Sequence, residues 1–164
     1  MIKLEENENN FKRKISVDIN KVGYILSEIF KKYNNKRICV VGTTCCGKSY
    51  LINKLDNCRD MDDEIFPLLN DEEKRTVCKT PWTSEIGAIM DRYVKEKIIT
   101  KPMYPVFGTV VINSDLIIYL NINKSLLKER CEIRGVNIND SLNMKSKIEK
   151  ELQITDKTII EICY

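Results

Sequence analysis

The stretch that decides the fold of this chain lies at residues 37–49 and reads Arg37-Ile38-Cys39-Val40-Val41-Gly42-Thr43-Thr44-Cys45-Cys46-Gly47-Lys48-Ser49. Its first five residues are rich in β-branched side chains and follow a turn-forming Asn-Asn pair, which predicts a fully buried parallel strand. The other eight match the pattern Gly-x-x-x-x-Gly-Lys-Ser, a glycine-rich loop that joins a strand to a helix. Leu51, Ile52 and Leu55 follow at helical spacing, so the order of strand, loop and helix is present.

The chemistry of this loop indicates a site for the β- and γ-phosphates of a nucleoside triphosphate such as ATP, bound with Mg²⁺. Backbone N–H groups from Thr44 to Ser49 form an anion-binding concavity at the start of the helix, and Lys48 places a positive charge on the transferred phosphate. Ser49 supplies a hydroxyl to Mg²⁺. We therefore expect the nucleotide to contact Gly42, Thr43, Thr44, Cys45, Cys46, Gly47, Lys48 and Ser49. The alternative, a glycine turn with an exposed lysine and serine, does not explain why all four identities follow a buried strand.

Cys45 and Cys46 occupy loop positions that often hold glycine or other small residues. Since the backbone binds the phosphates, we interpret the two thiols as small fillers rather than nucleophiles. A thiol beside Lys48 and a helix N-terminus could instead be acidified and open to oxidation.

The rest of the chain alternates helical and extended patterns. Apolar spacing and turn signals predict helices over 18–33, 83–97, 126–134 and 141–152, and strands over 97–100, 109–112, 115–122 and 158–162. Ser125 is the expected N-cap of the third of these helices, which Gly135 ends, and a loop holds Pro102, Pro105 and Gly108. Strands that alternate with helices predict an α/β domain with a mostly parallel sheet. We expect one domain over 18–164, preceded by a flexible N-terminal extension over 1–17.

The composition is that of a globular protein, with 43% hydrophobic and 31% charged residues and a formal net charge of +3. Seven cysteines without a CxxC pair, and the absence of histidine, argue against a zinc site or a disulfide framework. The start of the chain lacks a signal-peptide pattern, and no apolar run is long enough to cross a membrane. We expect no membrane contact and a cytoplasmic location. The abundance of Ile, Asn and Lys is a hint of an AT-rich bacterial, phage or viral genome, and a viral or phage protein would lie in the host cytoplasm.

A second constellation is Asp60-x-Asp62. Two carboxylates two residues apart on an extended segment point to the same side, so both can face one metal-centred site at the end of a strand. Asp60 is the candidate Mg²⁺ ligand with Ser49, and Asp62 is the candidate that orients or deprotonates a substrate hydroxyl. The alternative is that residues 60–64 form the acidic start of a solvated helix.

Arg130 and Arg134 are spaced i, i+4 on a predicted helix, so they share a face and can clamp phosphates. Positive charge of this kind stabilises the transition state of phosphoryl transfer. The alternative is a solvated face that pairs with neighbouring glutamates. The weaker candidates for the substrate side are Arg75, Arg92, Lys101 and Trp82, the last being equally suited to anchor a core or a lid.

Residues 37–152 resemble the small P-loop kinases, the group that includes nucleoside monophosphate kinases, shikimate kinase and gluconate kinase. The resemblance rests on the loop at 42–49, on Asp60-Met61-Asp62 as the DxD motif of the last two, and on residues 126–135 as a lid helix with paired arginines. It implies a three-layer P-loop NTPase fold, with ATP and Mg²⁺ bound. Two features depart from the pattern: ten residues between Ser49 and Asp60 are few, and Ile112-Asn113-Ser114-Asp115 is a poor Walker B segment.

We therefore expect an ATP-dependent phosphotransferase in which Lys48, Asp62, Arg130 and Arg134 act on the transferred phosphate and its acceptor. The acceptor is a small metabolite, a nucleotide or a polynucleotide 5′ end. Two alternatives remain: a P-loop ATPase or nucleotide-binding switch that acts on a partner protein, and prenyl transfer to an adenine, since the loop is also similar to that of isopentenyltransferases.

Overall fold

The computed structural model describes residues 5–6 and 12–164. Six parallel strands form the sheet, and their spatial order is β2 (Lys12–Ser16), β7 (Thr158–Cys163), β6 (Leu116–Asn121), β3 (Ile38–Val41), β5 (Val106–Gly108) and β4 (Arg59–Asp60). The short strand β1 (Glu5–Glu6) pairs antiparallel with β2 at one edge. The predicted strands around residues 37–41, 115–122 and 158–162 are confirmed as β3, β6 and β7.

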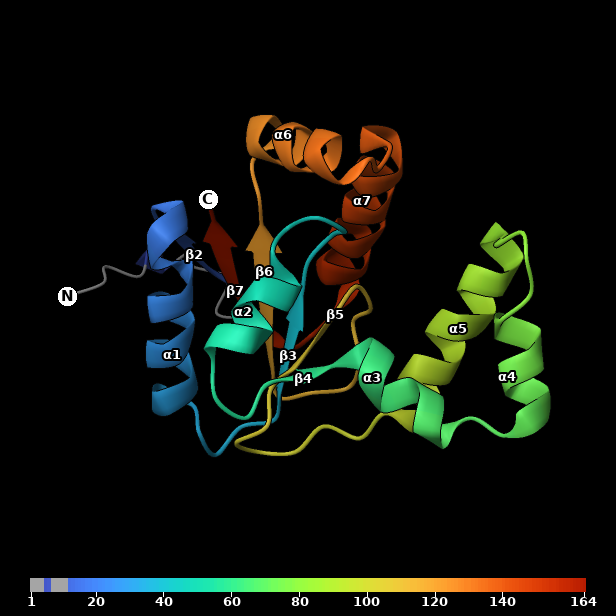
Figure 1. The fold of residues 1–164 in the computed structure, drawn as a ribbon. Coiled ribbons are helices and arrows are strands. Elements are labelled where there is room, and N and C mark those ends of the chain that lie inside the picture. The colour runs from blue at the N-terminus through green and yellow to red at the C-terminus, as the bar shows by residue number, and fades with distance from the viewer. Residues whose placement is uncertain (1–4, 7–11) are drawn as a thin grey trace.

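Helices cover both faces of the sheet, which gives the three layers of the predicted α/β fold (Figure 1). Alternate residues of each strand point to opposite faces. One face, which includes Val40, Ile118 and Ile160, packs against α1 (Val22–Lys32), α2 (Lys48–Lys54) and α6 (Lys124–Arg134). The other, with Val41, Ile117 and Ile159, packs against α3 (Met61–Ile65), α4 (Asp71–Val77), α5 (Ser84–Lys97) and α7 (Ile138–Ile154). The expected central parallel sheet with flanking helices is therefore confirmed.

The strand β3 lies in the middle of the sheet, between β5 and β6. The chain leaves β3 toward β4 at one edge, returns through β5, and then crosses to β6 on the opposite side of β3. In open α/β sheets, ligands bind at the carboxyl ends of the strands where the direction of winding changes. The loop at residues 42–47 follows the carboxyl end of β3, so it stands at this position.

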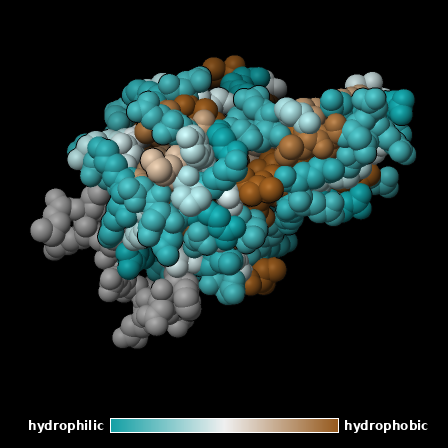
Figure 2. Space-filling model, turned by 90° about the horizontal axis from the view of Figure 1, so that it is seen from below, coloured by the Kyte–Doolittle hydropathy of each residue, from teal (hydrophilic) through white to brown (hydrophobic). Residues whose placement is uncertain are grey.

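An arm built from α3, the 3₁₀ turn Phe66–Leu68, α4 and α5 projects from one side of the sheet (Figure 1). Side-chain caps start both long helices of the arm: Asn70 and Glu73 form a reciprocal capping box at α4, and the Thr83 hydroxyl accepts from the Ile86 amide at α5. The view from below shows hydrophobic residues gathered where the arm joins the rest of the domain (Figure 2). The arm also provides one wall of the cavity described below.

The N-terminal boundary that the sequence predicts is wrong for residues 12–16. These residues form β2, which pairs in parallel with β7 from Lys12 opposite Ile159 to Ser16 opposite Cys163, and Ile15 is buried in the core. The polar residues around Ile15 face solvent at the sheet edge, so the segment lacks the apolar run of a central strand. Of the rest of the expected extension, residues 5–6 form β1, and residues 1–4 and 7–11 lie outside the described residues.

Three local predictions in the second half of the chain are also wrong, and one helix of the first half was missed. Residues 97–100 form no strand, and neither do residues 109–112; the extended pairing lies instead at β5, inside the expected proline-containing loop. The helix α6 begins two residues earlier than expected, because Asn123 rather than Ser125 caps it by accepting from the Leu126 amide at 2.8 Å. The helix α4 was not predicted, since its only buried residue is Val77.

The carboxylate of Asp115 lies at the amino end of β6 and binds Arg37 at the amino end of β3. The two side chains approach to 2.9 Å, and the Arg37 amide also donates to Asp115. These hydrogen bonds from Arg37 lower the pKa of Asp115 to about 2. Asp115 is thus a structural partner of Arg37 at the end of the strands opposite the loop, so it does not serve as a Walker B carboxylate.

We predict that Asp115→Asn lowers the melting temperature of the protein at neutral pH by about 1–2 °C, a small effect because both side chains are about a third exposed. The native-state pKa is depressed, so the stabilisation is present above the usual pKa of an aspartate and is lost as the pH falls toward about 2. Urea unfolding of both proteins across this pH range checks this. A difference that stays constant or grows with falling pH would contradict it.

Candidate functional site

The loop between β3 and α2 is held in a shape that requires its two glycines. A Cβ on Gly42 would lie 2.6 Å from the Cys46 sulfur and 3.1 Å from Leu120 Cβ, so the loop turns too tightly there for a larger residue. Gly47 has a φ of +104°, and a Cβ on it would meet Arg130 at 2.9 Å. Gly47 is also the N-cap of α2 and offers no capping side chain. The first N–H groups of α2 are therefore left without an intrahelical acceptor or a side-chain cap.

Lys48 folds back over the loop that precedes it. Its Nζ donates to the carbonyl oxygens of Gly42 at 2.8 Å and Thr43 at 2.7 Å, and it lies 3.6 Å from the Cys46 sulfur. These contacts hold the ammonium above the concave side of the loop. A phosphate in the loop would compete for the same ammonium with a full negative charge, which is a stronger partner than a carbonyl oxygen.

Thr43 and Thr44 fasten the loop to α7. The buried Thr43 hydroxyl donates to the Ser141 carbonyl at 2.5 Å, and the Thr44 hydroxyl lies 3.3 Å from the Met144 sulfur. Thr43 is therefore a structural residue whose side chain is turned away from any ligand, whereas Thr44 lines the cavity described below.

Cys45 and Cys46 are both buried, in line with their interpretation as small fillers. Burial and a hydrogen bond with Cys131 raise the pKa of the Cys45 thiol. This direction is opposite to the acidified thiol that the sequence left open. The Cys46 carbonyl accepts hydrogen bonds from Arg130 Nη1 at 2.8 Å and from the Tyr164 hydroxyl at 2.7 Å, so two distant segments fix this peptide group.

Arg130 and Arg134 both reach the loop from α6, as the i, i+4 spacing predicts. Arg130 contacts Cys46 and Gly47 directly, while Arg134 is more exposed and lowers the pKa of Cys45 by its charge. Within the described residues, neither Glu129 nor Glu132 forms an ion pair that would hold Arg130 or Arg134 away from the loop. The structure therefore brings both guanidinium groups to the side of the loop that faces the cavity.

Asp60 and Asp62 reach the same space by a different route from the one that their spacing predicts. Asp60 ends β4 and caps α3, where its Oδ1 accepts from the Asp62 amide at 2.8 Å; Asp62 lies in the first helical turn. The expectation of a single extended segment is wrong, and the alternative of an acidic helix start describes the backbone correctly. Both carboxylates nevertheless line the cavity beside the loop.

The pKa of Asp62 is raised above the usual value for an aspartate. The main cause is the loss of surrounding water in the cavity wall, followed by the negative charge of Asp60, and Asp63 adds to it. The positive charge of Lys48 acts in the opposite direction. Asp62 is thus a carboxylate that binds a proton more readily than usual, which suits a group that takes one from a hydroxyl.

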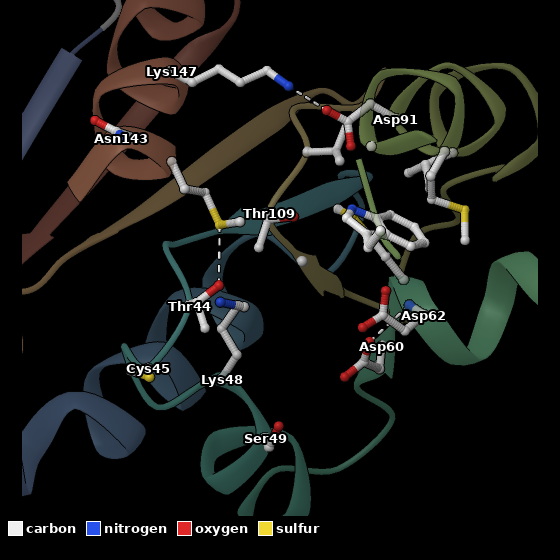
Figure 3. Close-up of a pocket in the computed structure, with 18 of the residues that line it drawn as sticks. Thr44, Cys45, Lys48, Ser49, Asp60, Asp62, Asp91, Thr109, Asn143 and Lys147 are labelled. Carbon is white, nitrogen blue, oxygen red and sulfur yellow. Dashed lines mark hydrogen bonds and ion pairs between the residues drawn. The ribbon is translucent and has the colours of Figure 1, made fainter. Parts of the chain in front are cut away.

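Most of these residues line one cavity of about 1110 Å³ between the loop, the arm, α6 and α7. Figure 3 shows Lys48 and Ser49 on the side of the loop, with Asp60 and Asp62 across from them. At the far end of the cavity, Lys147 of α7 forms an ion pair with Asp91 of α5 (Figure 3). Nine of the twelve predicted site residues therefore line this cavity: Thr44, Cys45 and Gly47 of the loop, Lys48 and Ser49 of α2, Asp60 of β4, Asp62 of α3, and Arg130 and Arg134 of α6.

Not every predicted residue reaches this cavity. Gly42, Thr43 and Cys46 shape the loop from behind, while Thr44, Cys45 and Gly47 line the cavity. The weaker candidates Arg75, Arg92 and Lys101 do not line it, and Trp82 does. Sequence reasoning missed Asp91, Thr109, Asn143 and Lys147. Thr109 directly follows the unpredicted strand β5, and the other three are polar residues on helices with no local pattern that distinguishes them from solvated side chains.

A second cavity of about 710 Å³ lies on the other side of the loop, between α1, α2 and Tyr164. It shares Gly47, Tyr50 and Arg130 with the first cavity. Tyr24 and Tyr50 line it with largely exposed rings. The loop therefore stands between two hollows, one flanked by carboxylates and the arm and the other by aromatic side chains.

Among the described residues, no group of three or more histidine, cysteine or carboxylate side chains could hold a metal ion alone. Nor does any helix within residues 12–164 have the length and apolarity that crossing a membrane requires. The chain matches no protein-family model and no curated protein in the comparisons made with its sequence.

Proposed function

We propose that this chain is an ATP-dependent phosphotransferase of the P-loop kinase type. The observation that carries the proposal is the meeting of Lys48, Arg130 and the Asp60–Asp62 pair in one cavity beside the glycine-rich loop. A loop that merely turns the chain needs no convergent cations and carboxylates from three other elements. Phosphoryl transfer needs both, because it relies on positioning and on neutralising charge.

Each residue has a distinct role in this proposal. The loop N–H groups and Lys48 bind the β- and γ-phosphates, and Lys48 leaves the carbonyls of Gly42 and Thr43 to do so. Arg130 and Arg134 neutralise the charge that develops as the bond between the γ-phosphorus and its bridging oxygen breaks. The acceptor hydroxyl approaches from the side of the arm, and Asp62 orients it and takes its proton.

The donor set fits Mg²⁺ that arrives with the nucleotide. Mg²⁺ is usually held by one or two carboxylates together with phosphate oxygens and water. Ser49 and Asp60 would provide the protein ligands, since both line the cavity and one Asp60 oxygen remains after the helix cap is made. When bound, the ion would supply positive charge to the β- and γ-phosphates. The nucleoside part of ATP has a place in the second cavity, where Tyr24 and Tyr50 offer aromatic surface.

The proposal is tested by incubating the purified protein with γ-labelled ATP and Mg²⁺ and with separate pools of nucleosides, nucleoside monophosphates, sugars and hydroxy acids, and 5′-hydroxyl oligonucleotides. Label in an organic product of one pool supports a kinase. If ATP binds but the label appears only in inorganic phosphate in every pool, the protein is instead an ATPase or a nucleotide-dependent switch.

The role of Asp62 predicts a particular pH dependence. Because its pKa is raised, kcat/KM should fall with acid at a pH above the usual range of an aspartate, as Asp62 becomes protonated. The variant Asp63→Asn removes one of the charges that raise this pKa, so the acid limb should move to lower pH while the rate near pH 8 is kept. A pH–rate profile of both proteins measures this. An acid limb at the same pH in both would count against Asp62 as the base.

A further inference from the structure

The arm forms one wall of the larger cavity, the one of about 1110 Å³. This wall differs in charge from the walls formed by the loop, α6 and α7, where the phosphates are proposed to bind. The segment from Asp60 to Val94 contributes three carboxylates to the cavity, those of Asp60, Asp62 and Asp91, and no lysine or arginine. The basic side chains among the described lining residues are Lys48, Arg130, Arg134 and Lys147, which come from α2, α6 and α7. The positive charge of the cavity is thus confined to the side of the loop and its covering helices.

Basic residues at the two ends of this segment have partners elsewhere. Arg59 forms an ion pair with Glu64 at 3.0 Å and donates to the Ile99 carbonyl, and Lys97 pairs with Glu73 at 3.2 Å. Lys147, which reaches the arm from α7, is paired with Asp91. An acceptor that carries its own phosphate or carboxylate would therefore meet carboxylates on this wall and no cavity-lining cation from the arm, and such like-charge contacts oppose binding.

The same wall presents aromatic surface to the cavity. The side chain of Trp82 is 57% exposed and that of Phe66 is 40% exposed, and both line the cavity. Gly87 lies next to Trp82, since a Cβ placed on this glycine would be 3.5 Å from the indole Nε1. An accessible indole ring binds planar rings by stacking. The carboxylate of Asp91 on the neighbouring helix turn can accept hydrogen bonds from the N–H groups of such a ring.

We propose that the phosphate acceptor is a nucleoside, an uncharged hydroxyl compound with a planar base that stacks on Trp82. The chemistry of transfer rests on the proposed function, whereas binding of the nucleoside does not. The hydroxyl oxygen forms a bond to the γ-phosphorus, the bond between that phosphorus and the β–γ bridging oxygen breaks, ADP leaves, and Asp62 receives the hydroxyl proton. The products are ADP and a nucleoside monophosphate.

Trp82 is the only tryptophan of the chain, so its fluorescence reports directly on this wall without any turnover. We expect saturable quenching of the wild-type protein by at least one nucleoside. The matching nucleoside monophosphate should bind about tenfold more weakly or worse, and a hydroxy acid should not quench. The control is the double variant Trp82→Phe, Tyr104→Trp, which moves the fluorophore to an exposed aromatic position outside both cavities. Its emission should not change beyond the absorption of light by the ligand.

Three further variants separate stacking and charge from a general loss of structure. Trp82→Ala should raise the KM for the nucleoside about tenfold or more and leave the KM for ATP unchanged. Tyr104→Ala, the loss of another exposed aromatic ring that lies outside the cavity, should change neither. Ala88→Lys places a cation on the exposed cavity side of α5 and should reverse the preference in favour of the monophosphate.

The outcomes distinguish this inference from the proposed function. Nucleoside quenching with phosphate transfer supports both, and quenching without transfer supports the nucleoside site while the kinase proposal fails. Tighter binding of a monophosphate or hydroxy acid than of any nucleoside, or no quenching by any nucleoside, overturns the inference. Label transferred to one of those other pools in the same experiments would leave the kinase proposal standing.

Discussion

Replacing Lys48 with alanine is expected to lower kcat by about 10³-fold or more while the fold is kept. The Nζ atom of Lys48 is the cation placed directly over the loop, within 2.8 Å of two loop carbonyls. Its loss leaves the loop without this ammonium, since Arg130 and Arg134 approach from α6 and have a separate proposed role at the breaking bond. The measurement is the steady-state rate of label transfer from γ-labelled ATP, with circular dichroism and Tm to verify the fold.

The matched control is Lys36→Ala, just before β3. Lys36 is exposed, lines neither cavity, and lies at the opposite end of β3 from the loop. This variant should retain kcat within about twofold, since a surface substitution away from a site usually changes the free energy by no more than about 0.5 kcal/mol. A Lys48→Ala protein with wild-type turnover would show that the loop does not act on a transferred phosphate.

Replacing Arg130 with alanine is expected to lower kcat by about 10³-fold with a smaller change in the KM for ATP. The guanidinium lies against the loop, with Nη1 2.8 Å from the Cys46 carbonyl and close to Gly47. From this position the guanidinium can stabilise the negative charge that develops at the breaking bond. It can also hold the loop in shape, so the kinetic constants must be measured separately to distinguish the two roles.

Two comparisons make that distinction. Arg130→Lys keeps the charge but loses the fork of donors, and it should restore part of kcat if charge is the main contribution. Lys128→Ala removes an exposed cation of the same helix and should have no effect. If Arg130→Ala raises the KM for ATP and leaves kcat unchanged, the residue is a structural support of the loop rather than part of the transfer machinery.

The centre of the site was predictable because its information is local. The buried strand, the two glycines, Lys48 and Ser49 are adjacent in sequence, and the shape of the loop depends on identities that the pattern itself contains. The pairing of Arg130 and Arg134 on α6 could also be predicted from the sequence, since i, i+4 spacing fixes a helix face. Their approach to the loop was a prediction from resemblance, and the contact between Arg130 and Cys46 places one of them there.

The strands that were not predicted from the sequence depend on pairing partners that lie far away in the chain. The strand β2 is stabilised by pairing with β7, about 150 residues later, and its own sequence is polar because it lies near the sheet edge. The short strand β5 is preceded by Pro105 and ends at Gly108, which are turn signals in a single sequence, and it becomes a strand only between β3 and β4. Short-range patterns contain neither piece of information.

The sequence also could not predict the position of the cavity wall that the arm forms. Trp82 lies just before α5, and Asp91 and Lys147 meet across the cavity although 56 residues separate them. Asp60 and Asp62 were predicted as site residues because both were expected on one extended segment, which is not what they form. They reach the site because β4 ends there and α3 begins with a carboxylate cap. The residue types were informative, whereas their arrangement required the fold.

The most direct test of the account is the fate of the γ-phosphate in a single reaction. Wild-type protein is incubated with γ-labelled ATP, Mg²⁺ and the acceptor pools, and the label in organic product is compared with the ADP formed. We predict one labelled organic phosphate for each ADP, in one pool, and neither product with Lys48→Ala. ADP formation matched by free inorganic phosphate, with no labelled organic product in any pool, would contradict the assignment of this chain as a phosphotransferase.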